Sequence, residues 1–316
     1  MRRAASREKS LVSTGELSKL VPALGAASQA RLLRTLNDAS LRGEVPASEV
    51  EAILAAEHKA PGELMSELLP VAQLYARPPI SHYRVGAVVR GVSGSLYWGA
   101  NLEVPGEMLG FSVHGEQSAV ANAYLHEERG LTALAVTAAP CGHCRQFLNE
   151  LAHAAELEVV IQGNAPARLG SLLPSSFGPD NLGVHERLFE NPPVDLEPLQ
   201  PATDELALAA VHAASRSYAP YTKAYSGIAI RSAKGAVYPG SYLENVAFNP
   251  SLSPLQSALV GLIMAREQFA DIADVVLAEV ESALISQMSA TRAVLGGIAP
   301  HARLERVAVR CCNATR

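Results

Sequence analysis

Apolar residues recur at helical spacing in the first part of the chain. They repeat every three or four positions in residues 30–36 and 49–54, as they do on one face of an amphipathic helix. Residues 63–75 carry the same spacing, and this stretch stops before Pro78-Pro79, where a helix cannot continue. The pattern predicts a small helical segment over residues 1–60, followed by a helix that opens the next part of the chain.

The pattern changes to strands alternating with helices after residue 84. Short β-branched and aromatic runs flank a glycine-containing turn, which predicts a hairpin, and helical periodicity then returns twice. The predicted elements are strands 85–90 and 96–100, helix 114–127, strand 131–137, helix 141–152 and strand 155–162. Strands that alternate with helices after an opening hairpin favour an α/β layered sandwich.

The second half of the chain repeats the first. At a shift of 141 residues, the matched positions include Gly86 with Gly227, Gly94 with Gly235, Tyr97 with Tyr238, Gly99 with Gly240 and Glu103 with Glu244. The shift becomes 139 where residues 117–119 match residues 256–258. Turn glycines at a nearly fixed offset indicate two copies of one fold. With the proline-rich stretch 189–201 as linker, we expect a helical segment at 1–60, a first domain at 61–190 and a second at 200–316.

The candidate chemistry lies in two short stretches of the first copy. His114 and Glu116 form an H-x-E sequence, and Cys141 and Cys144 form a C-x-x-C sequence preceded by Pro140. One imidazole and two thiolates are three zinc ligands, and a hydrolytic site keeps the fourth position for water, whose pKa falls to about 7 on zinc. Two residues rotate a helix by about 200°, so Glu116 reaches that position only if the helix begins near His114.

Three other side chains that could bind zinc have competing interpretations. His143 lies inside the C-x-x-C loop; as a fourth ligand it would make the zinc structural, whereas as a flanking surface histidine it leaves the site open. Cys311 and Cys312 follow an apolar run and are interpreted as core or tail thiols.

The second copy lacks the chemical groups of the first. On the register of the repeat, His114 aligns with Ser253 and Glu116 with Leu255, and the place of the C-x-x-C sequence, near residues 281–284, holds no cysteine. The second copy is therefore predicted to keep the scaffold without the catalytic residues.

Composition narrows the possible partners. The chain has 316 residues, 48% of them hydrophobic, and a formal net charge of −5, so it has no positive field for nucleic acid or an anionic membrane. No apolar run reaches the roughly 18 residues of a membrane span, and residues 1–9 lack the apolar core of a secretory signal. Four cysteines do not make a disulfide framework. We expect a small substrate, no nucleic-acid or membrane partner, and a cytoplasmic protein.

Together, H-x-E and P-C-x-x-C match the signature of zinc-dependent nucleobase deaminases. The chain resembles the cytidine deaminase family, in particular its two-domain homodimeric branch, over residues 63–295. The segments that carry the resemblance are 90–94, 99–103, 116–119, 140–147, 177–179 and 244–250. The resemblance implies duplicated three-layer α/β/α domains after a small helical segment. It also implies hydrolysis of cytidine and 2′-deoxycytidine to the uridines and ammonia, as in pyrimidine salvage.

The resemblance further implies a role for individual residues. One Zn²⁺ per chain would be held by His114, Cys141 and Cys144, with Glu116 as the proton shuttle. The residues implied in substrate binding are Asn101 and Glu103 on the ribose, Tyr83 on the base, Phe177 at the pocket and Phe248 in an apolar loop of the second copy. In a homodimer this loop would cover the site of the partner subunit.

Two positions depart from the family pattern, and one competing substrate has to be weighed. Gly115 stands where the family usually has alanine, which adds backbone freedom, and Tyr83 stands where it usually has phenylalanine, so a hydroxyl needs a partner. The same chemistry on a cytosine within RNA or DNA is disfavoured, because the carboxylate of Glu103 suits a free sugar hydroxyl and repels a phosphate.

Overall fold

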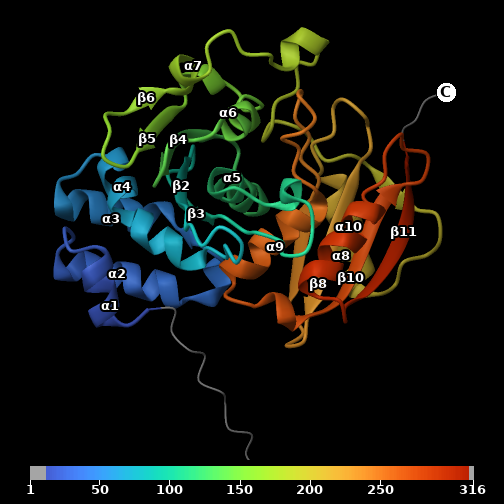
Figure 1. The fold of residues 1–316 in the computed structure, drawn as a ribbon, viewed down its shortest axis with the longest axis horizontal. Coiled ribbons are helices and arrows are strands. Elements are labelled where there is room, and N and C mark those ends of the chain that lie inside the picture. Colours follow the sequence, from blue (N-terminus) through green and yellow to red (C-terminus); the bar gives the residue numbers. More distant parts are fainter. Residues whose placement is uncertain (1–11, 313–316) are drawn as a thin grey trace, which may run out of the picture.

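The N-terminal segment is helical with one added strand. A computed structural model describes residues 12–312 (Figure 1), so the charged residues 1–9 and the start of the predicted helical segment lie outside the described residues. The helices are α1 (Thr14–Leu20), α2 (Ala26–Asn37) and α3 (Ala47–Glu57). The strand β1 (Glu44–Val45) was not predicted, because two residues carry no periodicity; it pairs antiparallel with β3 (Leu96–Ala100).

The first copy is a mixed sheet between helices. Its strand order is β1-β3-β2-β4-β5-β6, in which β2 and β3 form the predicted hairpin and β4 and β5 are parallel. Helix α4 covers one face and α5 the other, which gives three layers (Figure 1). The bounds are β2 (Gly86–Gly91), β4 (Leu131–Val136), β5 (Glu158–Ile161), β6 (Ala167–Arg168), α4 (Pro61–Ala72), α5 (Gly115–Leu125), α6 (Gly142–Leu148) and α7 (Leu169–Leu172).

The second copy repeats this topology. Its order is β7-β11-β10-β8-β9, and β9-β8-β10-β11 corresponds to β3-β2-β4-β5, including the parallel pair. The bounds are β7 (Leu196–Pro198), β8 (Ser226–Ser232), β9 (Val237–Ser241), β10 (Ile272–Val280), β11 (Arg303–Cys311), α8 (Glu205–Ser215), α9 (Pro254–Met264) and α10 (Met288–Ile298). The α/β duplication is confirmed. The stretch predicted as a linker contains β7, which pairs with β11 at the edge of this sheet.

The matched glycines Gly99 and Gly240 have a common physical cause. A Cβ atom on Gly99 would lie 2.1 Å from the backbone nitrogen of Ala119, and one on Gly240 would lie 2.2 Å from that of Ala258. In each copy the central helix therefore rests directly on the hairpin strand, and no side chain fits between them.

Helices α5 and α9 pack against each other in the middle of the molecule, as Figure 1 shows. Every residue of α9 is buried, and α5 is buried from its first residue to its tenth, as expected for helices at the centre of a core. Their third residues make equivalent contacts across the two copies. Gln117 Nε2 donates to the carbonyl of Pro250 at 3.0 Å, and Gln256 Nε2 donates to that of Phe111 at 3.1 Å.

The structure differs from the predictions around α6. The helix predicted over 141–152 ends at Leu148, because the chain turns there and the Glu150 carbonyl accepts a hydrogen bond from the Leu188 N–H group at 3.0 Å. In the second copy the corresponding helix, α10, begins at Met288 with Gln287 as its N-cap, so the place of Cys141 is taken by Gln287 and not by residues 281–284. Among the described helices, none has the length and apolar character needed to cross a membrane.

Candidate metal centre and active site

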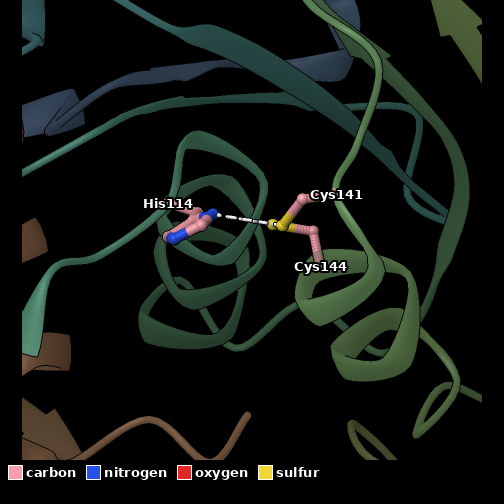
Figure 2. Close-up of side chains that lie close together, drawn as sticks. All are labelled: His114, Cys141 and Cys144. Carbon is pink, nitrogen blue, oxygen red and sulfur yellow. Dashed lines mark hydrogen bonds between the residues drawn. The ribbon is translucent and has the colours of Figure 1, made fainter. Parts of the chain in front are cut away.

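The predicted zinc ligands meet where two helices begin. His114 is the N-cap of α5 and Cys141 is the N-cap of α6, with Cys144 in its first turn. Figure 2 shows the imidazole of His114 facing both sulfurs. The His114 Nδ1 atom lies 3.5 Å from Cys141 Sγ and 3.3 Å from Cys144 Sγ, and the sulfurs are 3.6 Å apart.

These separations fit a tetrahedral zinc ion. With Zn–S bonds of about 2.3 Å and Zn–N bonds of about 2.0–2.1 Å, the edges of the tetrahedron are about 3.8 Å between sulfurs and about 3.6 Å between sulfur and nitrogen. The observed distances are within about 0.3 Å of these values. His114, Cys141 and Cys144 are the one group of potential metal ligands found among residues 12–312. The donor set therefore fits Zn²⁺ with one position free.

The pKa values of the two thiols are shifted in opposite directions. A hydrogen bond from the Cys144 thiol, together with backbone N–H groups of the first turn of α6, lowers the pKa of Cys141 to about 4. The pKa of Cys144 is raised because this thiol is the donor and because it is buried. Zinc binds thiolates, so its binding would favour the deprotonated form of both groups.

Glu116 lies beside the three ligands. It is the second residue of α5 and is buried, and burial raises the pKa of its carboxyl group, while a hydrogen bond with the Cys144 thiol lowers it. The prediction that the helix begins at His114 is confirmed. A carboxyl group next to the ligands and outside their set has the placement that a proton shuttle requires.

His143 is not one of the three grouped ligands, and it is half-buried where a surface position was expected. Its ring centroid lies 5.3 Å from that of His114 at a tilted angle. Burial and the neighbouring imidazole lower the pKa of His143, so it packs against His114 as a neutral ring. Cys311 and Cys312 lie outside the metal group, as expected, and Trp98 is a core side chain.

Asn101 and Glu103 hold the loop that carries Tyr83. Asn101 accepts from the Val85 N–H group and donates to the Tyr83 carbonyl, both at 2.9 Å. Glu103 accepts from the N–H groups of Ile80 and Ser81 at 2.8 and 2.9 Å and from the Ser81 hydroxyl at 2.5 Å. Burial raises the pKa of Glu103, but these bonds outweigh it and lower the pKa, so the group is ionised.

The three aromatic residues expected at the substrate site are exposed. The exposed fraction is 59% for Tyr83, 47% for Phe177 and 61% for Phe248. Phe177 is tied to α6 through its carbonyl, which accepts from Gln146 Nε2 at 2.9 Å and Asn149 Nδ2 at 3.1 Å. The structure therefore assembles the metal group with Glu116, and it places the aromatic rings at the surface of the single chain.

The packing reason for Gly115 and the buried carboxyl group of Glu150 were missed in the sequence. A Cβ atom on Gly115 would lie 2.8 Å from Val85 Cγ1, which explains the departure from alanine better than backbone freedom does. Glu150 is a fully buried carboxylate bonded to the second copy. An acidic residue shortly after the C-x-x-C helix was the only signal for it, and its partners are too distant in sequence to be inferred.

Comparison with known proteins matches both copies. The family description "Cytidine and deoxycytidylate deaminase zinc-binding region" matches residues 59–160 and again residues 169–292. A cytidine deaminase from Photobacterium profundum is 41% identical over 271 residues, which are 86% of this chain and 91% of that one. One from Vibrio vulnificus is 44% identical over 75% of this chain and 80% of its own length. One from Proteus mirabilis is 46% identical over 74% of this chain and 79% of its own length.

The first family match lies in the first copy and contains His114, Cys141, Cys144 and Glu116, and the second begins at residue 169, near the end of the first copy, and covers most of the second. With relatives above 40% identity aligned over most of both chains, this chain belongs to the cytidine deaminase family.

Proposed function

We propose that the protein is a zinc-dependent hydrolase that deaminates cytidine and 2′-deoxycytidine to the corresponding uridines with release of ammonia. The observation that carries this proposal is the group of His114, Cys141 and Cys144 at zinc-ligand spacing, with the buried carboxyl of Glu116 beside it. The relatives named as cytidine deaminases support the choice of substrate.

The proposed mechanism needs one group that moves protons. A bound Zn²⁺ supplies Lewis acidity, which lowers the pKa of water to about 7 and makes a nucleophile at neutral pH. Glu116 takes a proton from the attacking water and delivers it to N3 of the pyrimidine while the water oxygen adds to C4. Glu116 then takes the second proton from the hydroxyl group now on C4 and transfers it to the exocyclic amine; the bond from C4 to that amine breaks, the C4 carbonyl forms, and ammonia leaves.

The sugar contacts favour a free nucleoside. An ionised carboxylate offers about four acceptor positions. Glu103 uses three of them on the loop, which leaves about one for a ribose hydroxyl. The same negative charge repels a phosphate at that position, and the net charge of −5 disfavours a polyanionic substrate.

A spectrophotometric assay tests this proposal. Purified protein loaded with zinc is incubated with cytidine, 2′-deoxycytidine, cytosine, adenosine and a cytidine-containing oligonucleotide. We expect conversion of the two cytosine nucleosides alone, with one ammonia released per uridine formed. No turnover of either nucleoside would contradict the proposal, and conversion within the oligonucleotide would favour the nucleic-acid alternative.

We also propose a homodimer in which the loop that carries Phe248 covers the site of the partner subunit. The exposed rings of Phe177 and Phe248 support this, because large aromatic side chains on a surface are typical of contact areas. Light scattering tests it, since an active species at the chain mass of 33.3 kDa would exclude a lid from a partner. A role in pyrimidine salvage in the cytoplasm, where thiolates stay reduced, completes the proposal.

A further inference from the structure

Glu150 joins the metal-binding helix to the second copy. It lies two residues beyond α6, and its side chain is fully buried. Its carboxylate accepts from the Tyr218 hydroxyl at 2.8 Å, the Tyr221 hydroxyl at 2.9 Å and the Val246 N–H group at 2.5 Å. No salt bridge within residues 12–312 includes Glu150; hydrogen bonds from the second copy satisfy this buried carboxyl group, and the charge of Arg187 also acts on it.

The third donor, Val246, belongs to the loop 245–251 that carries Phe248. A second bond fixes the same loop, because Asn245 Nδ2 donates to the carbonyl of Gln146 in α6 at 2.8 Å. Phe248 itself has a φ angle of 62°, in the left-handed region that a phenylalanine seldom adopts. Such a conformation persists only where the surrounding contacts fix it. Here they are the bonds to Gln146 and Glu150, the bond from Gln117 Nε2 of α5 to the Pro250 carbonyl, and hydrogen bonds within the loop, such as that from the Phe248 N–H group to the Asn245 carbonyl.

Helix α6 is thus a common support for both exposed phenylalanines. Its first turn carries Cys141 and Cys144, while Gln146 and Asn149 hold the Phe177 carbonyl. Asn245 and Glu150 hold the Phe248 loop on the same segment. One short helix and the two residues after it therefore hold the backbone near both phenylalanines, and Gln117 of α5 adds one more bond to the loop 245–251.

We infer that Glu150 is a positioning residue for the proposed deamination: it fixes loop 245–251, and with it the ring of Phe248, relative to the helix that carries Cys141 and Cys144. This inference rests on the proposed function. It holds whether the ring of Phe248 meets the substrate of its own chain or that of a second copy, since the loop is anchored on α6 in either case.

A purely structural role for Glu150 makes a different prediction. Loss of a buried contact between the copies would lower stability and the fraction of active enzyme, which reduces kcat and leaves KM unchanged. A misplaced aromatic ring weakens substrate binding and raises KM with little change in kcat. Two measurements therefore distinguish the roles. One is whether the substitution changes kcat or KM, and the other is whether the change in KM requires the Phe248 ring.

The experiment is a double-mutant cycle with Glu150→Gln, Phe248→Ala and the combined variant, using cytidine as substrate. We expect Glu150→Gln, which replaces one of the two acceptor oxygens by an amide group, to raise KM by about tenfold; this corresponds to about 1.4 kcal/mol, within the range for one ordinary hydrogen bond. In the Phe248→Ala background the same change should leave KM unaltered. A normal KM in Glu150→Gln, or effects that multiply in the double variant, would overturn the inference.

Two further variants guard against a folding artefact. Tyr221→Phe removes one of the three donors and keeps the ring that lies 6.4 Å from that of Phe248, so a smaller rise of KM is expected. Glu128→Gln is the matched control. Glu128 is a buried carboxylate that accepts from Ser93 and Tyr97 within the first copy, and its replacement should leave KM unchanged. All variants should keep one zinc per chain by elemental analysis.

Hydrogen exchange of backbone amides separates failure of this inference from failure of the proposed function. In Glu150→Gln the amides of residues 246–251 should exchange faster than in the parent protein, while those of α6 should not. Unchanged exchange in the loop would refute the positioning role even if cytidine is converted. Faster exchange in a protein that converts no cytidine would refute the proposed function and keep Glu150 as the anchor of the loop.

Discussion

Replacement of Gly115 by alanine is expected to destabilise the protein, although alanine is the better helix former. Gly115 is the first residue of α5, directly after the metal ligand His114. A methyl group there would lie 2.8 Å from Val85 Cγ1, whereas ordinary contact begins at 3.4 Å. Val85 must therefore move by about 0.6 Å, and it is β-branched and stiff.

The expected magnitude is the difference between two effects. Overpacking costs about 1–3 kcal/mol, and removal of a helical glycine returns up to about 0.5–1 kcal/mol, so the free energy of unfolding should fall by about 1 kcal/mol. The displacement also reaches the proposed sugar site. The Val85 N–H group donates to Asn101 Oδ1 at 2.9 Å, and its carbonyl accepts from the Asn101 N–H group at 3.3 Å. The KM for cytidine should rise as well.

Urea unfolding of the zinc-loaded protein measures the first effect and steady-state kinetics the second. The control is a double-mutant cycle that combines Gly115→Ala with Val85→Ala, because the smaller side chain at position 85 makes room for the new methyl group. The double variant should be more stable than the sum of the single effects predicts, by about 1 kcal/mol. A Gly115→Ala protein as stable as the parent, with no coupling to Val85, would show that the close contact is not what selects glycine.

Three other predictions follow from the site. Glu116→Gln should keep its zinc and lose at least about 10²-fold in kcat, and near-normal turnover would exclude it as the shuttle. Cys141→Ser should lose zinc by elemental analysis while Cys312→Ser keeps it; equal zinc contents would refute the ligand assignment. Burial raises the pKa of Glu150 above its usual 4.5. The stability that its proton contributes is therefore full below pH 4.5 and is lost as the pH rises through the folded-state pKa. In urea titrations, the stability deficit of Glu150→Gln relative to the parent should shrink from pH 5 to pH 8, and a growing deficit would contradict this.

The parts of the fold that could be predicted depend on short-range patterns. Alternating strands and helices have their own periodicities, and the copy was recognisable because glycines such as Gly99 and Gly240 are required by the same close packing of helix on strand. The metal ligands were predictable because each half of the set is a compact motif. His114 and Cys141 also lie at helix N-termini, and the start of a helix can be recognised from neighbouring residues alone.

The remaining features depend on contacts between distant segments. Strand β1 is only two residues long and exists through pairing with β3. The end of α6 depends on Leu188, and Glu150 depends on Tyr218 and Val246, which lie 68 and 96 residues further along the chain. Gly115 is explained by its close contact with the side chain of Val85, which lies 30 positions earlier in the sequence. No periodicity or motif encodes such partners, so they had to come from the structure.

The N-terminal segment adds an edge strand, β1, to the sheet of the first copy as well as apolar residues to the core. It closes the outer side of β3, and the Trp98 N–H group is satisfied by the Gly43 carbonyl at 2.9 Å, just before that strand. In the second copy β9 ends the strand order without such a cover from the described chain. A chain shortened to begin at α4 would leave the backbone N–H and C=O groups on the outer edge of β3 unpaired. Another chain could then add a strand to this edge. Residues 12–57 thus cover the outer edge of the sheet in the copy that contains His114, Cys141 and Cys144.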